Sequence, residues 1–236
     1  MILERGITLR QAAMVVLFGV LITTFGTPIA EFVIWPTLVI PSNIEETVRN
    51  IRADEGKFLA ATFAYLAGFA GDVLVAWALY ILLRPVNRHL SMLSAWLRVV
   101  SAVISIGAAL NLVTAFRLLD SPKIETALGS DQLHAQVLVL LNSFRYEWGM
   151  GLVLFGIHLC LLGYLVYRSS YIPRLVGIAL AIAGIGYIVY NLGPYLYPDA
   201  DLEFVYVALS GEVVFLLWLA FRGWRIREPA EHRPDE

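Results

Sequence analysis

Three ionisable side chains, Asp72, His158 and Glu212, each stand alone in the middle of a long apolar segment. Each is followed by an arginine near the end of its segment, twelve residues later for Asp72 and ten for the other two. In helices that cross a membrane in one direction, a rise of 1.5 Å per residue puts all three about 15 to 18 Å from the arginines. A lone charge at that depth costs at least ~2.5 kcal/mol, so we expect the three side chains to face inward and contact one another, water or a ligand.

The composition indicates a polytopic membrane protein. Of 236 residues, 59% are hydrophobic and 15% charged, and the mean hydropathy is +0.72, well beyond the range of soluble domains. A net charge of -2 without a basic stripe argues against nucleic acid and leaves membrane lipid as the expected partner. The single cysteine, Cys160, excludes an intrachain disulfide and a cysteine-based zinc site.

The apolar segments predict an all-α fold with six transmembrane helices in one domain, residues 1–227, and a polar, disordered tail at 228–236. The predicted spans are an uncharged run between Arg10 and Glu31, followed by 58–83, 92–118, 148–167, 173–195 and 204–221. Short amphipathic helices are expected in the two larger external loops, at 42–56 and 131–144. Ser42 and Glu45 have the spacing of a capping box for the first of these. Residues 145–149 are expected to interrupt the helix before the fourth span.

The distribution of arginine predicts the orientation. Arginine pairs or clusters occur at the N-terminus, in two loops and at the C-terminus, all on one side of the six-helix arrangement. Positive charge is enriched in cytoplasmic loops, so both termini are expected in the cytoplasm and the protein in the cell membrane.

Four further polar residues are candidates to support the buried layer: Arg98, Asn111, Glu147 and Asn191. Arg98 lies about 9 Å inside the cytoplasmic end of its helix. It has two interpretations, since a long side chain there could snorkel to the interface or join the layer. Glu147 shares a helix face with His158 and could continue a polar path toward the outside.

Three classes of function are open. The layer of Asp72, His158 and Glu212 could be a proton-titrating or ion-binding site in a small transporter or ligand-binding membrane protein. The same three side chains could bind a metal and form an intramembrane hydrolase, although no metal is favoured and no cofactor is expected. They could also form a structural polar network in an assembly or stress-response factor.

Several stretches resemble a known family. These are ALYILLRPVNRHLSMLSAWLR at 78–98, GLVLFGIHLCLLGYLVYRSSYIPRLVGIAL at 151–180, and the pair Gly211 and Glu212 with Trp218 and Gly223. The chain is similar over most of its length to bacterial multi-pass membrane proteins of the domain of unknown function 4386 family. That resemblance implies a six-helix membrane protein in which Asp72, His158 and Glu212 are characteristic positions, and it implies no activity. The segment 41–43 departs from the family pattern.

Overall fold

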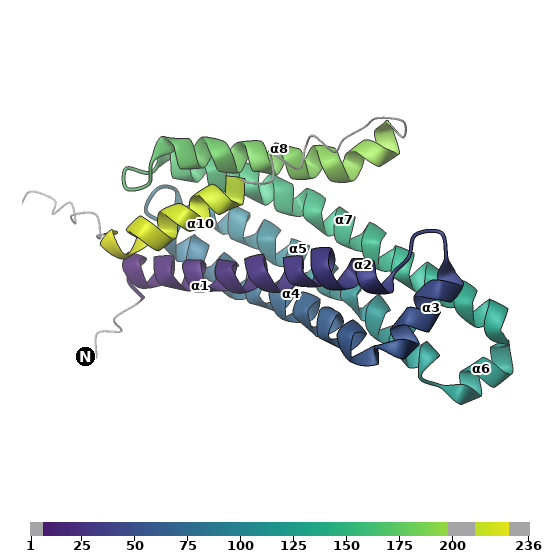
Figure 1. Cartoon of the computed structure of the whole chain (residues 1–236). Coiled ribbons are helices and arrows are strands. Elements are labelled where there is room, and N and C mark those ends of the chain that lie inside the picture. The colour runs from purple at the N-terminus through teal and green to yellow at the C-terminus, as the bar shows by residue number, and fades with distance from the viewer. Residues whose placement is uncertain (1–6, 198–210, 227–236) are drawn as a thin grey trace, which may run out of the picture.

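The structure is a computed structural model that describes residues 7–197 and 211–226, and these residues form helices joined by short turns, with no strand among them (Figure 1). Three short elements are α3 (Ile44–Ala53), α6 (Pro122–Leu128) and the 3₁₀ turn η3 (Gly223–Arg225). The others are α1 (Leu9–Pro28), which continues through the π-helical turn η1 (Ile29–Ile34) into α2 (Trp35–Leu38), and then α4 (Glu55–Leu83), α5 (Arg88–Leu119), α7 (Ser130–Arg168), α8 (Arg174–Leu196) and α10 (Gly211–Arg222).

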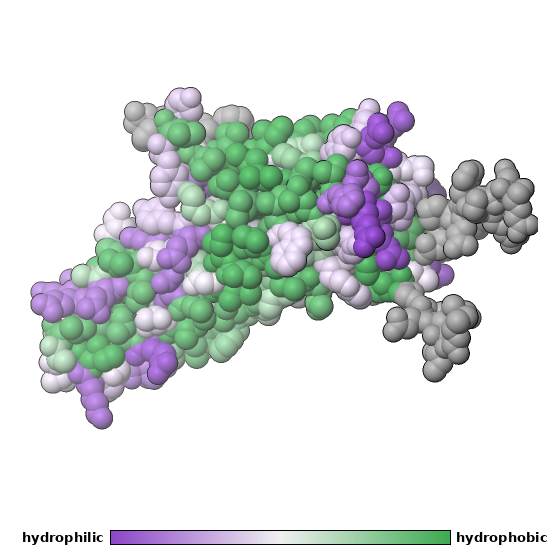
Figure 2. Space-filling view, turned by 180° about the vertical axis from the view of Figure 1, so that it is seen from behind, coloured by the Kyte–Doolittle hydropathy of each residue, from purple (hydrophilic) through white to green (hydrophobic). Residues whose placement is uncertain are grey.

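Five helical segments in the described part are long and apolar enough to cross a membrane: Leu9–Leu38, α4, α5, α7 and α8. In Figure 2 hydrophobic residues form a broad band across the middle of the visible face, and hydrophilic residues gather toward both ends. These features indicate a membrane protein. The sixth predicted span is described only from Gly211 onward, as α10, and the predicted tail at 228–236 lies outside the described residues.

The five long segments and α10 close into a ring. Helices that follow one another in the chain pack side by side, from α1 to α4, α5, α7 and α8. The last helix, α10, contacts both α8 and α1 and so completes the ring. In Figure 1 the start of α1 and the end of α10 lie at one end of the bundle, and α3 and α6 lie at the other. We call these the terminal end and the loop end.

Two sequence-based expectations about local structure are wrong. Residues 145–149 do not interrupt a helix, because α7 runs unbroken through them for 39 residues. Most of that segment has ordinary helix propensity, and polarity alone breaks no backbone hydrogen bond. The helix α3 is capped by Asn43, whose Oδ1 accepts from the Glu46 backbone N–H at 3.0 Å. Ser42 instead takes a left-handed turn conformation with φ 64°, and the N-cap lies one residue later than predicted.

Glycines bring α7 and α8 into backbone contact. A Cβ added to Gly156 would lie 2.6 Å from the Gly184 carbonyl oxygen, and one added to Gly163 would lie 2.6 Å from that of Gly177. Helices that lack side chains at such points can approach closely, which is a common way to pack helices in a membrane. The register between α7 and α8 is therefore fixed by two pairs of glycines.

We predict that Gly163→Ala destabilises the protein, because backbone atoms of α8 cannot move aside for the new methyl group. Overpacking of this kind costs ~1 to 3 kcal/mol. Gly107→Ala is the matched control, because a Cβ at that helical position meets nothing within 4 Å. The thermal midpoints of both variants in detergent are the measurement. Equal midpoints for Gly163→Ala and Gly107→Ala would contradict the close α7–α8 contact.

Candidate functional site

Arg98 on α5 is the centre of the buried polar cluster. Its side chain is 4% exposed, and its NH2 group donates to Oδ1 of Asp72 on α4 at 2.6 Å. Its NH1 group lies 3.3 Å from Nε2 of His158 on α7, and its guanidinium lies 4.9 Å from the centroid of the Phe155 ring. The snorkelling interpretation of Arg98 is therefore wrong, because the side chain points inward and joins three helices.

The contacts of His158 define its tautomer. An arginine can only donate, so Nε2 must accept from Arg98 and the ring proton must lie on Nδ1. Nδ1 is 2.8 Å from the Ser94 carbonyl oxygen, to which it donates, and 2.9 Å from the Ser94 hydroxyl. His158 is fully buried and in this arrangement it is neutral. The permanent cation of the cluster is Arg98.

Glu212 joins the cluster indirectly. The Tyr187 hydroxyl on α8 donates to Oε1 of Glu212 on α10 at 2.9 Å, and the Tyr187 ring packs edge-on against Phe155. The Phe155 ring lies in turn against the Arg98 guanidinium, so Tyr187 and Phe155 link Glu212 to Arg98. The three predicted residues therefore lie around a common centre, although Arg98 separates Asp72 from His158 and Tyr187 holds Glu212.

Each of five consecutive helices in the ring supplies one member of this cluster, which we call the Arg98 cluster: Asp72, Arg98, His158, Tyr187 and Glu212. A seam of buried hydroxyl groups continues along α5 toward the loop end. Ser101 donates to the Gly151 carbonyl oxygen at 2.7 Å, and Ser105 donates to the Ser101 carbonyl oxygen at 2.9 Å. The sequence analysis missed Tyr187 and these serines. Ser94, Ser101 and Ser105 recur at helical spacing around Arg98, and this periodicity was the available signal.

The other supporting candidates lie outside the cluster. Glu147 is exposed and accepts from the Asn111 side chain on α5 at 2.9 Å. Asn191 donates to the Tyr187 carbonyl oxygen of its own helix at 2.8 Å. Asn111 and Glu147 join α5 to α7 nearer the loop end, and Asn191 serves the packing of α8.

Comparison with known proteins places the chain in a family. The family model described as "Domain of unknown function (DUF4386)" matches residues 16–223. The chain belongs to the DUF4386 family. An uncharacterised protein of Archaeoglobus fulgidus is similar, with 36% identity over 158 residues, which cover 66% of this chain and 80% of the relative. No solved structure matches.

The Arg98 cluster of this DUF4386 protein does not suit a metal ion. Oδ1 of Asp72 and Nε2 of His158 both face the Arg98 guanidinium, a permanent positive charge that repels a metal cation. Among the residues that the structure describes, no three His, Cys, Asp or Glu side chains are placed to hold a metal. The metal-bound arrangement considered from the sequence therefore has no support in the donor set.

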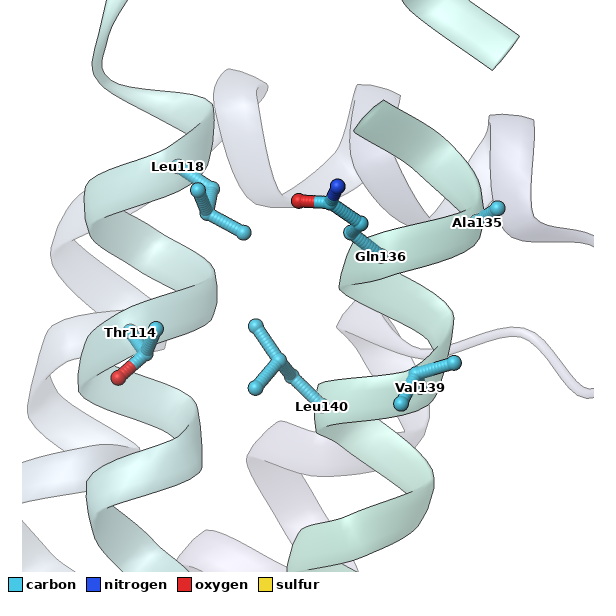
Figure 3. A pocket seen from close by; sticks show the side chains of 6 residues that line it. All are labelled: Thr114, Leu118, Ala135, Gln136, Val139 and Leu140. Atoms are coloured by element: carbon cyan, nitrogen blue, oxygen red, sulfur yellow. The ribbon is translucent and has the colours of Figure 1, made fainter. Parts of the chain in front are cut away.

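A separate groove of about 450 Å³ lies between α5 and α7 near the loop end (Figure 3). It is lined by Thr114, Leu118, Ala135, Gln136, Val139 and Leu140. Thr114 is sixteen residues beyond Arg98 on the same helix, about 24 Å at the rise of an α-helix. The lining is mostly apolar, so the groove offers little chemistry and is distinct from the Arg98 cluster.

We predict that Arg98→Gln destabilises the protein strongly, because it leaves Asp72 without a cation inside the bundle. Breaking a buried pair costs ~3 to 5 kcal/mol. The double variant Asp72→Asn/Arg98→Gln should recover part of this loss, since neither charge remains. The measurement is chemical or thermal unfolding in detergent, arranged as a double-mutant cycle.

Arg52→Gln is the matched control for this cycle. Arg52 pairs with Glu125 at 2.8 Å, but both side chains are 37% exposed, and such a pair contributes ~0 to 1 kcal/mol. If Arg98→Gln and Arg52→Gln had equal effects, Arg98 would not be a buried partner of Asp72.

Proposed function

We propose that the protein is a small proton- or ion-coupled transporter or ligand-binding membrane protein, and that the Arg98 cluster is its site. One observation carries the proposal: Asp72 is bonded to the Arg98 guanidinium, and a second carboxylate, Glu212, is linked to the same cation through Tyr187 and Phe155. His158 is neutral in its hydrogen-bonded tautomer. With both carboxylates ionised the cluster carries one excess negative charge, which uptake of a proton would balance. The burial of the cluster makes that balance energetically important.

A second feature favours exchange of water or a ligand at this site. The Nε atom of Arg98 is buried and has no hydrogen-bond partner among the residues that the structure describes. A buried donor without a partner costs ~1 to 3 kcal/mol. An oxygen atom of water or of a small ligand beside Nε would remove that cost. A purely structural network is the competing proposal, and it requires that the cluster take up no proton.

We predict that infrared difference spectra between acid and alkaline pH contain a buried carboxyl C=O band that Glu212→Gln removes. Tyr187→Phe should keep the band and shift its frequency, because the Tyr187 hydroxyl is bonded to Oε1 of Glu212. Glu125→Gln is the control, since its exposed carboxylate belongs to another region of the protein. Spectra in which Glu212→Gln removes no more than Glu125→Gln does would favour the structural network.

Transport itself is tested in proteoliposomes with an entrapped pH-sensitive dye and a panel of small solutes added one at a time. A solute that drives proton flux with the wild-type protein, but not with Glu212→Gln, would identify the coupled substrate. Proton uptake in the spectra without any coupled flux would instead support a ligand-binding protein.

We further propose six membrane spans, with α10 in the last, and both termini in the cytoplasm of a cell whose plasma membrane holds the protein. The arginine asymmetry supports this orientation. In a Cys160→Ser background, we predict that cysteines at Asn87 and Ser130 react oppositely with an impermeant maleimide in intact cells. Asn87 lies in the α4–α5 turn at the terminal end and Ser130 starts α7 at the loop end. Equal labelling of the two positions would contradict the proposed topology.

A further inference from the structure

A second polar cluster lies at the loop end of the bundle, around Glu31. Oε2 of Glu31 accepts from the Tyr65 hydroxyl on α4 at 2.5 Å, and Oε1 pairs with Arg145 on α7. The Glu31 side chain is 16% exposed and that of Arg145 is 41% exposed. One carboxylate in the first span therefore joins α4 and α7, two helices that also supply members of the Arg98 cluster. In the sequence, Glu31 only marks the end of the first uncharged run.

The helix is irregular where it presents Glu31. The first span changes from α to π winding at Ile29–Ile34, immediately after Pro28. Proline cannot donate a backbone hydrogen bond, which gives the irregularity a local cause. Single π turns inside α-helices are frequent at functional sites, and they differ from the flanking turns in hydrogen bonding. The segment that carries Glu31 is thus a place where the helix can change conformation.

Five aromatic rings, which we call the aromatic group, pack together in the bundle interior next to this cluster: Trp35, Tyr65, Phe69, Phe144 and Trp148. Tyr65 and Phe144 are both fully buried, with ring centroids 5.0 Å apart. Trp148 packs on both rings and on Phe69, and the Arg145 guanidinium lies 5.1 Å from the centroid of the Trp35 ring. Arg145 therefore contacts the Trp35 ring while it pairs with Glu31, a combination of contacts for which a guanidinium is better suited than an ammonium group.

The aromatic group lies level with the hydroxyl seam. Ser105 is seven residues beyond Arg98 on α5, about 10 Å nearer the loop end. Gly151, whose carbonyl accepts from Ser101, is three residues from Trp148 on α7. Tyr65 and Phe69 likewise precede Asp72 by seven and three residues on α4. The hydroxyl seam and the aromatic rings therefore occupy the same levels of the bundle, between the Arg98 cluster and Glu31.

We propose that Glu31, Tyr65 and Arg145 form a latch that closes the loop end of the bundle over the hydroxyl seam and the Arg98 cluster. Release of Glu31 frees the π-helical turn from α4 and α7, and Arg145, already partly exposed, turns to water. The aromatic group then loses its cover, and water reaches Ser105. The role in access rests on the proposed function, because only a cluster that exchanges protons or ligands requires a route to water.

The test measures the accessibility of Ser105→Cys in a Cys160→Ser background, with the protein in nanodiscs so that a charged methanethiosulfonate reagent reaches both faces. Ser105 is 3% exposed, so the cysteine should react slowly while the latch is intact. We expect Glu31→Gln and Arg145→Gln each to raise its labelling rate about tenfold, equivalent to ~1.4 kcal/mol in the opening equilibrium. If Ser105→Cys protein does not fold, Ser101→Cys replaces it, one turn deeper in the seam.

Two controls separate the latch from general loosening. Arg52→Gln breaks an exposed ion pair elsewhere at the loop end and should leave the labelling rate unchanged. A second reporter, Ala12→Cys, is buried in α1 near the terminal end and should stay slow in every variant. An unchanged rate at Ser105→Cys, or a rise at both reporters, would overturn the latch.

This outcome is separate from that of the proposed function. If the latch variants raise the labelling rate but the Glu212 infrared band is absent, Glu31 and Arg145 still close the loop end, whereas the proton-binding proposal and the role of the latch in access to that site fail. If the band is present and the labelling rate does not respond, the proton-binding proposal stands and the latch fails.

Discussion

The burial of one guanidinium constrains the whole bundle. Removing a charge from water costs several kcal/mol, which is offset only by partners at short range and in good geometry. Arg98 contacts Asp72 on α4, and it contacts His158 and the Phe155 ring on α7. Small shifts of α4 or α7 relative to α5 would lengthen these contacts. These contacts form only in one register of α4, α5 and α7. The serines beside Arg98 on α5 are small enough for α7 to approach closely.

Close packing extends that register to the remaining helices. The paired glycines of α7 and α8 determine the position of Tyr187 along the axis of the bundle. The Tyr187 hydroxyl in turn donates to Glu212. Gly211 has the same role one residue earlier, because a side chain there would collide with the backbone of Ala179 on α8. Glu212 can thus approach the Arg98 cluster because its neighbour in sequence has no side chain. The polar contacts and the glycine contacts reinforce the same arrangement.

The sequence was informative about this site where a residue type is rare for its surroundings. Asp72, His158 and Glu212 stand out because ionisable groups are costly in apolar segments, and their matched distances from arginines suggested a common depth. Arg98 was harder to place, since a long cationic side chain near a helix end can snorkel and its direction depends on neighbouring helices. Tyr187 gave no signal, because tyrosine carries no charge at neutral pH and does not stand out in an apolar segment as a carboxylate does. The helical class followed from composition and periodicity, whereas the continuity of α7 depends on backbone hydrogen bonding that polarity does not reveal.

The two polar clusters differ in charge balance. Glu31 pairs with Arg145, and Asp72 pairs with Arg98, so each of these pairs is neutral. Glu212 has a tyrosine hydroxyl as its hydrogen-bond partner and forms no ion pair of its own in the described part of the chain. It is linked to Arg98 indirectly, through two aromatic side chains, whereas Asp72 is bonded to that cation. A change of protonation at Glu212 therefore alters the net charge around Arg98 and the balance between its two carboxylates, without any rearrangement of the neutral pair at the loop end.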